Sequence, residues 1–319
     1  MSTANNTVQL AVERYLKQRR QLGFELSITG QQLMRFARYA DARGHRGPLT
    51  LELQLDWARE HVKRTGLVTW ARRLEVVRPF AAYYCQFQPG TEIPDLHTFG
   101  PSHRRLAPHI YTEQEVCDLL ERAGRLPPLD GVRPATYRTL FGLIATVGLR
   151  LSEALNLPDG DVDLRRACLT VRHTKFNKSR CLPLHSSVVQ ALNEYRQLRD
   201  RRVETRADTP FFVSQSGWAL PKRTVQNVFV QLRQQLSWQA RGDYPHPRIQ
   251  DLRHSFAVAR LLRWYETGES VDHAMLWLCT YLGHASISDT YWYLSGTPEL
   301  MSVVGARLES FVLEEVRHA

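Results

Sequence analysis

A stretch rich in proline and glycine divides this chain into two parts with different sequence patterns. A chain of 319 residues is long enough for two domains. Closely spaced prolines and glycines interrupt helices and strands, so the stretch is typical of a linker. We expect a first domain in residues 1–88, a linker at 89–108 and a second domain in residues 109–319. The linker contains Pro89, Gly90, Pro94, Gly100, Pro101 and Pro108.

The first part of the chain has the pattern of a small helical domain. Apolar residues recur at helical spacing in four segments of residues 7–87. Ser27 and Thr50 are candidate N-caps for the second and third of these segments. The fourth segment, residues 67–87, contains Pro79, which predicts a kink or a break in that helix.

The second part is expected to be mainly helical with a small antiparallel sheet. Thr112 and Glu115 have the spacing of a capping box, which predicts the start of its first helix. Residues 167–184 read as a β-hairpin, and residues 210–214 are a candidate further strand. Helical spacing predicts further helices at about residues 187–202, 222–236, 249–265, 271–282, 286–294 and 306–316.

The charge of the chain favours a polyanionic partner. The formal net charge is +10 and the pI is about 9.6, and Lys and Arg bind polyanions because they neutralise phosphates and release counterions. Charge alone is a weak indicator of nucleic-acid binding. Only five of the 42 basic residues are lysines, and two of these, Lys175 and Lys178, lie close together.

Cysteine usage and hydropathy indicate a protein of the cytoplasm. The five cysteines are odd in number, scattered and without a C-x-x-C pair, so we expect neither a disulfide framework nor a zinc ribbon. The first residues lack the basic and apolar regions of a signal peptide, and no apolar run approaches the ~18 residues of a membrane span. We therefore expect no membrane partner.

The segment ATVGLRLSEALNL, residues 145–157, contains the first candidate for chemistry. An apolar helix is expected to stop at Gly148, just before Arg150. An arginine at a helix junction can offer its guanidinium to a phosphate, and Glu153 can orient that guanidinium from behind. A surface Arg–Glu pair at i,i+3 is the ordinary interpretation of the segment taken alone.

The hairpin VRHTKFNKSRCLPL, residues 171–184, places Lys175 and Lys178 at its turn. A lysine on such a turn can protonate a leaving alkoxide, because its ammonium is a compact charge whose pKa responds to its surroundings. Taken alone, these lysines are better explained by a solvated hairpin tip.

The segment RIQDLRHSFAVARLL, residues 248–262, is typical of an amphipathic helix. Gln250 and Arg253 share one face at i,i+3, and Arg253 is a second candidate guanidinium. His254 lies about 100 degrees around the helix from Arg253, so we interpret it as a histidine of the core or behind the site.

The segment YLGHASISDTYWYL, residues 281–294, combines a histidine with an aromatic cluster. A helix is expected to end at Gly283, followed by His284 and a short helix with Tyr291, Trp292 and Tyr293. A tyrosine has an ordinary pKa near 10 and needs cationic neighbours to act as a nucleophile. Taken alone, such a cluster more often indicates core packing.

Together, in this order and spacing, the four segments resemble the tyrosine recombinase (phage integrase) family. The pattern of that family is Arg, a hairpin Lys, His-x-x-Arg, then His or Trp, and Tyr. The nucleophile of the family lies nine residues past the LGH histidine, which selects Tyr293 over Tyr291. The other matches are GLRLSE at Arg150, TKFNKSRCLPL at Lys175, DLRHSFA at Arg253 and LGHASIS at His284.

The resemblance covers nearly the whole chain. The first part, with AVERYLKQRRQLGFE, is similar to the helical, SAM-like core-DNA-binding domain of the family. The second part is similar to the mixed α/β catalytic domain. No separate arm-binding domain is expected before it, as in the compact recombinases of the chromosome-resolution and transposon-borne groups.

One position departs from the family pattern. The family usually has His where this chain has Gln250. Glutamine can hydrogen-bond a phosphate oxygen but cannot exchange a proton with the nucleophile. His246 could replace the missing histidine only if the chain bends at Pro245 and Pro247. We therefore interpret Gln250 as a phosphate-contacting residue, in an enzyme that is slower because the histidine is absent.

The resemblance implies that Tyr293 attacks a phosphate of double-stranded DNA and forms a 3′-phosphotyrosyl link. Arg150, Arg253 and His284 are then expected to stabilise the non-bridging oxygens, and Lys175 to protonate the leaving 5′-oxygen. This chemistry requires neither ATP nor a metal ion as cofactor. The sequence has no Walker motif and no convincing metal-ligand cluster.

The family context also implies partners and a cellular role. Recombination cuts two duplexes in pairs, so a tetramer on DNA is expected, with related recombinases as further candidate partners. Residues 306–316 form a candidate docking helix with Leu308, Phe311 and Val312, although an intramolecular helix explains the same pattern. DNA integration, transposition or resolution at the bacterial nucleoid is the expected role.

Two other functions remain open at this point. A type IB topoisomerase uses a similar residue set, but the N-terminal part and the hairpin sequence argue against it. A DNA-binding accessory protein descended from a recombinase is the alternative from another class, with Gln250 marking a catalytically weakened site.

Overall fold

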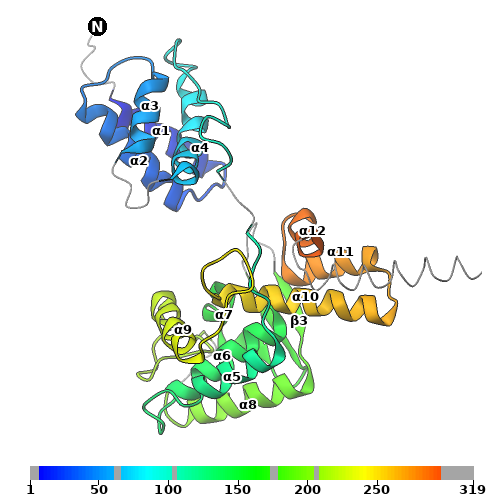
Figure 1. The fold of residues 1–319 in the computed structure, drawn as a ribbon. Helices are drawn as coiled ribbons and strands as arrows, with labels where there is room; N and C mark the ends of the chain where they lie inside the picture. Colours follow the sequence, from blue (N-terminus) through cyan, green and yellow to red (C-terminus); the bar gives the residue numbers. More distant parts are fainter. Residues whose placement is uncertain (1–6, 61–65, 103–105, 173–178, 205–207, 296–319) are drawn as a thin grey trace, which may run out of the picture. The chain divides into compact units, whose positions relative to one another are not determined.

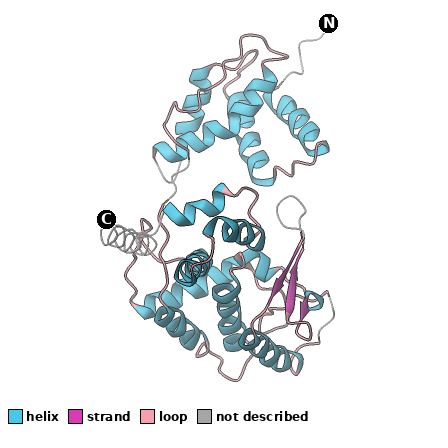
Figure 2. Ribbon diagram, turned by 90° about the vertical axis from the view of Figure 1, so that its right-hand side faces the viewer, coloured by secondary structure: helices cyan, strands magenta, loops and turns pink. Residues whose placement is uncertain are grey.

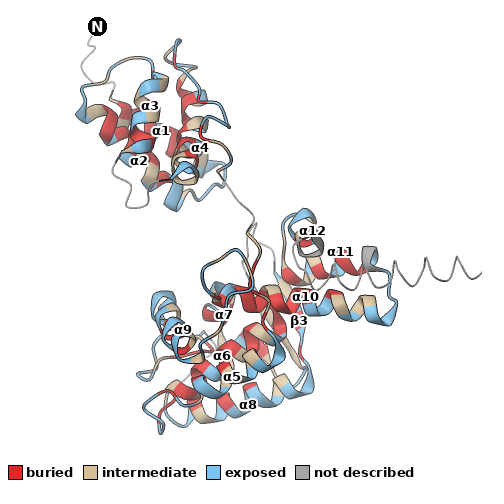
Figure 3. Cartoon of the chain, viewed as in Figure 1, coloured by how far each residue is buried: buried red, intermediate tan, exposed pale blue. Residues whose placement is uncertain are grey.

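The computed structural model describes residues 7–60, 66–102, 106–172, 179–204 and 208–295 (Figure 1). The chain divides into two compact units, Met1–Arg105 and Leu106–Ala319. This division falls within the proline- and glycine-rich stretch of residues 89–108. Each unit has its own buried core (Figure 3).

The described part of the first unit is helical. Val12, Phe36 and Phe80 are fully buried at its centre, and the ring of Trp57 lies edge-on against Phe36. Apolar side chains at helical spacing therefore supply the core. The helices are α1 (Val8–Gln21), α2 (Ser27–Ala42), α3 (Leu51–Arg59) and α4 (Leu67–Tyr84).

Of the local predictions for this unit, the Thr50 cap is confirmed, the Ser27 cap is wrong, and the break at Pro79, one of its two predicted effects, does not occur. Thr50 caps α3, since its side chain accepts a hydrogen bond from the backbone N–H of Leu53. Ser27 is already the first residue of α2, and the cap position is Leu26, whose side chain cannot accept a hydrogen bond. Pro79 does not end α4, because the turns that follow it are held in the core by Phe80 and its neighbours.

The second unit is mainly helical with one small sheet (Figure 2). Its helices before the sheet are α5 (Glu113–Ala123), α6 (Arg133–Val147), α7 (Leu151–Leu155) and the 3-10 helix η1 (Asp159–Asp161). The helices after the sheet are α8 (Ser186–Asp200), α9 (Lys222–Leu236), α10 (Ile249–Thr267), α11 (Val271–Leu282) and α12 (Ser288–Ser295).

The sheet contains the predicted hairpin. The strands β1 (Val162–Asp163), β2 (Cys168–Val171) and β3 (Arg180–Pro183) are antiparallel in the order β1-β2-β3. Val171 and Arg180 are the pair nearest the connection between β2 and β3, which includes residues 173–178, outside the described residues. The candidate strand at 210–214 is wrong: only single bridges form there, at Pro210 and Val213, and proline has no N–H to extend a ladder.

Helix α6 lies at the centre of the second unit, packed by α5, α8 and α10 (Figures 1 and 3). Leu140, Phe141 and Ile144 of α6 are fully buried, as is Leu252 of α10. The predicted capping box at Thr112 is present at the start of α5. Burial of the first half of α10 fixes the position of Arg253, which follows Leu252 directly.

The expectations about membrane spans and about the cysteines can be compared with the described residues. No helix among them has both the length and the apolar character that a membrane crossing requires. All five cysteines are described, and each is a free thiol.

Candidate active site

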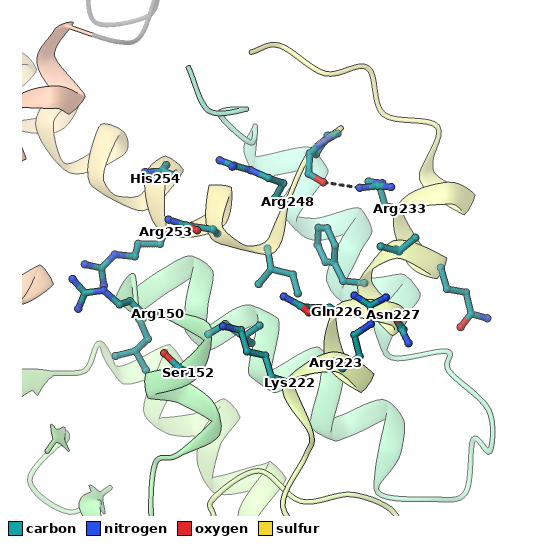
Figure 4. A pocket seen from close by; sticks show the side chains of 18 of the residues that line it. Arg150, Ser152, Lys222, Arg223, Gln226, Asn227, Arg233, Arg248, Arg253 and His254 are labelled. Carbon is teal, nitrogen blue, oxygen red and sulfur yellow. Dashed lines mark hydrogen bonds between the residues drawn. The ribbon is translucent and has the colours of Figure 1, made fainter. Parts of the chain in front are cut away.

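A groove in the second unit brings together most of the side chains that the sequence singles out. It has a volume of about 1070 Å³ and is lined by α7, α9, the start of α10 and residues around α12. Figure 4 shows Arg150 and Arg253 close together on one side of the groove, with Lys222 and Arg223 on another. All of these residues belong to the unit Leu106–Ala319.

Arg150 is held at the junction of two helices, as predicted. Helix α6 ends at Gly148, which has φ +71°, and a Cβ there would come within 2.4 Å of the Phe256 ring. Arg150 is the N-cap of α7, and its backbone N–H donates to Glu153 Oε2 at 2.9 Å. Its Nη1 donates to Glu153 Oε1 at 2.7 Å. The side chain is 36% exposed and lines the groove, so a ligand there can reach it.

Arg253 is almost completely buried beside Arg150. Its Nη1 donates to the carbonyl oxygen of Gly148 at 2.8 Å, and its Nη2 donates to that of Leu282 at 2.7 Å. These bonds join α10 to the end of α6 and to the end of α11. A buried charge needs partners of this kind, because desolvation would otherwise be costly.

Glu153 is the anion of this cluster. Its carboxylate is paired with Arg150 and Arg180 and lies 3.7 Å from Arg253 Nη1. Burial by itself raises the pKa of Glu153, but hydrogen bonds from the Arg180 side chain and the Arg150 backbone outweigh burial and hold the pKa below its usual value. Glu153 is therefore ionised at neutral pH, consistent with the predicted role of orienting Arg150.

His284 follows directly on the end of α11. Gly283 ends the helix with φ +66°, and the backbone N–H of His284 donates to the carbonyl of Cys279. Its Nδ1 lies 2.7 Å from the hydroxyl of Thr290 in α12. Burial first, then the charges of Arg253 and Arg150, lower the pKa of His284 to about 4, so the ring is neutral at pH 7.

His254 lies on the groove wall next to Arg253. Its ring meets that of Trp292 edge-on, with centroids 5.4 Å apart. Burial first, then the charges of Arg248 and Arg253, lower its pKa to about 3. The imidazole is therefore neutral at pH 7, and it lines the groove rather than lying wholly behind the site.

Gln250 is exposed in the first turn of α10 and lines the groove. The turn is fixed by Arg248, whose backbone N–H and guanidinium both bond the fully buried Asp251. His246 is exposed and does not line the groove, so the structure does not bring it to the position of the missing histidine.

Two predicted residues fall wholly or partly outside the described residues. Tyr293 belongs to α12, between Trp292, which lines the groove, and the end of that helix, but its side chain is outside the described residues. Lys175 lies between β2 and β3 and is also outside them. The structure therefore brings together Arg150, Arg253 and His284 and leaves the roles of these two residues as predictions.

Two features of the site are not predicted from the sequence: Arg180 and the groove-lining residues of helix α9. Arg180 of β3 contacts Glu153, and only its place at the end of the lysine hairpin could have singled it out among 37 arginines, the 42 basic residues less five lysines. Helix α9 was predicted without a function. Its basic and amide residues at i, i+1, i+4 and i+5 were the available signal: Lys222, Arg223, Gln226 and Asn227 line the groove.

The described residues contain no group of three or more His, Cys, Asp or Glu side chains that could hold a metal ion. The polar side chains of the groove are instead mostly cationic or amide-bearing. Such a surface is suited to bind phosphate groups.

The sequence that forms the groove matches a known protein family. The Phage integrase family model matches residues 110–299, which include the whole groove. The protein y4rB of Sinorhizobium fredii, which carries an integrase/recombinase name, is 39% identical over 95% of this chain and 98% of its own length. The tyrosine recombinase XerC of Lacticaseibacillus casei is 29% identical over 89% of this chain and 92% of its own.

The fold is similar to that of a solved transposon integrase. The Tn1549 transposon integrase, in complex with transposon right end DNA, superposes with a TM-score of 0.67. The match covers 95% of this chain and 99% of that one at 16% identity, so it concerns the fold.

Proposed function

The chain belongs to the phage integrase family of tyrosine recombinases, and we propose that it cuts and rejoins DNA at specific sites through a phosphotyrosine at Tyr293. One observation carries this proposal. Arg150, Arg253 and His284 converge at one groove, and the helix that contains Tyr293 begins four residues after His284. A tyrosine needs cationic neighbours of this kind to attack a phosphate.

In the first step, the phenolic oxygen of Tyr293 bonds to phosphorus and the bond from phosphorus to the 5′-oxygen breaks. Arg150 and Arg253 offset the charge that develops on the non-bridging oxygens. Lys175 gives a proton to the leaving 5′-oxygen. The amide of Gln250 does not act as an acid or a base, so it donates a hydrogen bond to a phosphate oxygen. The phenolic proton of Tyr293 passes to water.

His284 acts as a neutral hydrogen-bonding group. Its pKa of about 4 means that the ring carries no charge near pH 7. Because Thr290 bonds Nδ1, the rotation of the ring is fixed before DNA binds. Nε2 then serves the phosphate as a donor, with Nδ1 accepting from the threonine hydroxyl.

In the second step, the 5′-hydroxyl of a partner strand attacks the phosphotyrosine and releases Tyr293. The phosphodiester energy is kept in the protein–DNA bond, so no ATP or metal ion is needed. Two duplexes are exchanged by four subunits, with residues 306–316 docking between neighbours. Residues 1–88 form the core-binding domain and hold DNA together with α9, as DNA binding by the Tn1549 transposon integrase supports.

The test is a covalent adduct on DNA. A duplex selected by the protein from a random-sequence pool is nicked next to the cleavage position, so that the cut strand is lost and the adduct accumulates. The wild-type protein is expected to form a denaturation-resistant adduct, and Tyr293→Phe is expected to bind the same duplex without forming one. Binding without any wild-type adduct would instead make the chain an accessory DNA-binding protein. Relaxation of a supercoiled plasmid that lacks the selected site would indicate a topoisomerase.

A further inference from the structure

The C-terminal end of α11 is bonded by three arginines from three different elements. The carbonyls of the last two residues of α11 and of the residue that follows each accept a hydrogen bond from one guanidinium. Carbonyls at a helix end lack intrahelical donors and form the negative end of the helix dipole, so cations stabilise them. The bonds are Arg180 Nε to Tyr281 O (2.8 Å), Arg253 Nη2 to Leu282 O (2.7 Å) and Arg150 Nη2 to Gly283 O (3.0 Å).

The same three arginines surround one carboxylate, that of Glu153. Arg180 binds it with two nitrogens, Nη2 to Oε2 at 2.8 Å and Nη1 to Oε1 at 3.3 Å. Arg150 bonds Oε1, and Arg253 lies within ion-pair distance of Oε2. Three cations and one anion leave a net charge of +2 at this point (3 − 1) when His284 is neutral.

Arg180 differs from the other two arginines in how it is enclosed. Its side chain is only 10% exposed, against 36% for Arg150, and it is not among the residues that line the groove. A Cβ on Gly283 would come within 2.6 Å of Arg180 Nη1, so the guanidinium packs directly against the turn before His284. Arg180 therefore contacts Glu153 and the end of α11, which support the phosphate-binding residues, without reaching the groove itself.

We propose that Arg180 is a positioning residue for strand cleavage, acting through Glu153 and the end of α11 on Arg150 and His284. The inference rests on the proposed function. By sharing the Glu153 carboxylate, Arg180 leaves the charge of Arg150 available to the phosphate. Without Arg180 the local net charge falls to +1, Glu153 is neutralised mainly by Arg150, and the turn that carries His284 loses one of its three bonds.

The test is single-turnover cleavage of the selected, nicked duplex. Arg180→Gln is expected to slow adduct formation on the order of 100-fold, the loss typical of misplaced phosphate-binding groups, with unchanged DNA affinity. Arg180→Lys keeps the charge but not the two-pronged geometry, so it is expected to recover only part of the rate. A methylphosphonate at the scissile position removes the phosphate charge, and on this substrate the Arg180→Gln defect is expected to shrink about tenfold.

Arg172→Gln is the matched control, because Arg172 follows β2 in the same hairpin but pairs with Asp161 and is exposed. Its cleavage rate is expected to match the wild type on both substrates. An Arg180→Gln rate equal to that of Arg172→Gln, or a defect of the same size on both substrates, would overturn the inference. Absence of a wild-type adduct would overturn the proposed function instead.

Discussion

His284 Nδ1 lies 2.7 Å from the hydroxyl oxygen of Thr290, so the histidine after α11 is tied to the helix that contains Tyr293. Thr290 is completely buried, and its hydroxyl has little freedom to turn elsewhere. Tyr293 lies three positions after Thr290 along α12. The bond thus links the orientation of a phosphate-binding ring to the helix of the nucleophile.

Thr290→Val tests this link, because valine keeps the shape of threonine and removes the hydroxyl. We expect strand cleavage to slow by about 10- to 100-fold, as for other groups that orient a functional histidine. Single-turnover adduct formation measures the effect.

Thr280→Val is the control for that change. Thr280 lies on α11 and is exposed, and its hydroxyl donates to the carbonyl of Leu276 in the same helix. Its cleavage rate is expected to stay within about twofold of the wild type, as expected for a surface change. Equal rates for the two variants would show that the Thr290 bond does not orient His284.

The pH dependence of stability tests the burial of His254. The folded chain has a His254 pKa of about 3, against an ordinary value of 6.5. Between these values the unfolded chain binds more protons, so stability falls as the pH is lowered below about 6.5. His254→Asn is expected to remove about 1–2 kcal/mol of the loss between pH 7.5 and pH 5.

Urea unfolding midpoints at several pH values between 5 and 7.5 measure this difference. The variant is expected to be less stable than the wild type at pH 7.5 but to lose less on acidification. Parallel curves for the two proteins would contradict the lowered pKa.

Much of the fold of the second unit could be predicted from local signals. The helices expected at residues 222–236, 249–265 and 271–282 begin at the predicted residues, because apolar spacing specifies them, and α11 ends at Gly283 as predicted. The strand predicted at 210–214 failed because Phe211 and Phe212 are buried without a partner strand. Local β-propensity cannot show whether a partner strand is present.

Gly148→Ala tests how the end of α6 positions Arg253. Gly148 has φ +71°, and an added Cβ would clash with the Phe256 ring. We expect a loss of about 2–4 kcal/mol in the free energy of unfolding, from backbone strain and the clash together. Cleavage is also expected to slow, because Arg253 bonds the Gly148 carbonyl.

Gly268→Ala is its matched control. Gly268 has a similar φ of +76° at the end of α10, but nothing lies within 4 Å of the added Cβ. It is expected to lose only about 1 kcal/mol, and to cleave DNA at the wild-type rate. Equal losses for the two variants would mean that the ring of Phe256 moves aside.

Gln250→His tests the one departure from the family pattern. An imidazole at this exposed position of the groove can exchange a proton, so cleavage is expected to speed up about tenfold near pH 7.5. The rate is expected to become pH-dependent with a midpoint near 6.5. A rate and pH profile unchanged from those of the wild type would place residue 250 away from the chemistry.

The candidate site could be predicted only in part. Arg150, Arg253 and His284 follow from motif order and spacing, and the structure brings them to one groove. Apart from its place at the end of the hairpin, Arg180 carries no local signal, because its partners Glu153 and Tyr281 are distant in sequence and meet it only in the folded chain. Contacts of this kind depend on the tertiary fold, which periodicity does not specify.

Fragment-ion mass spectrometry of the trapped adduct locates the side chain that is linked to DNA. We expect a nucleotide on Tyr293 alone, with Tyr291→Phe forming adduct normally and Tyr293→Phe forming none. A nucleotide on Tyr291 or on another side chain would contradict it.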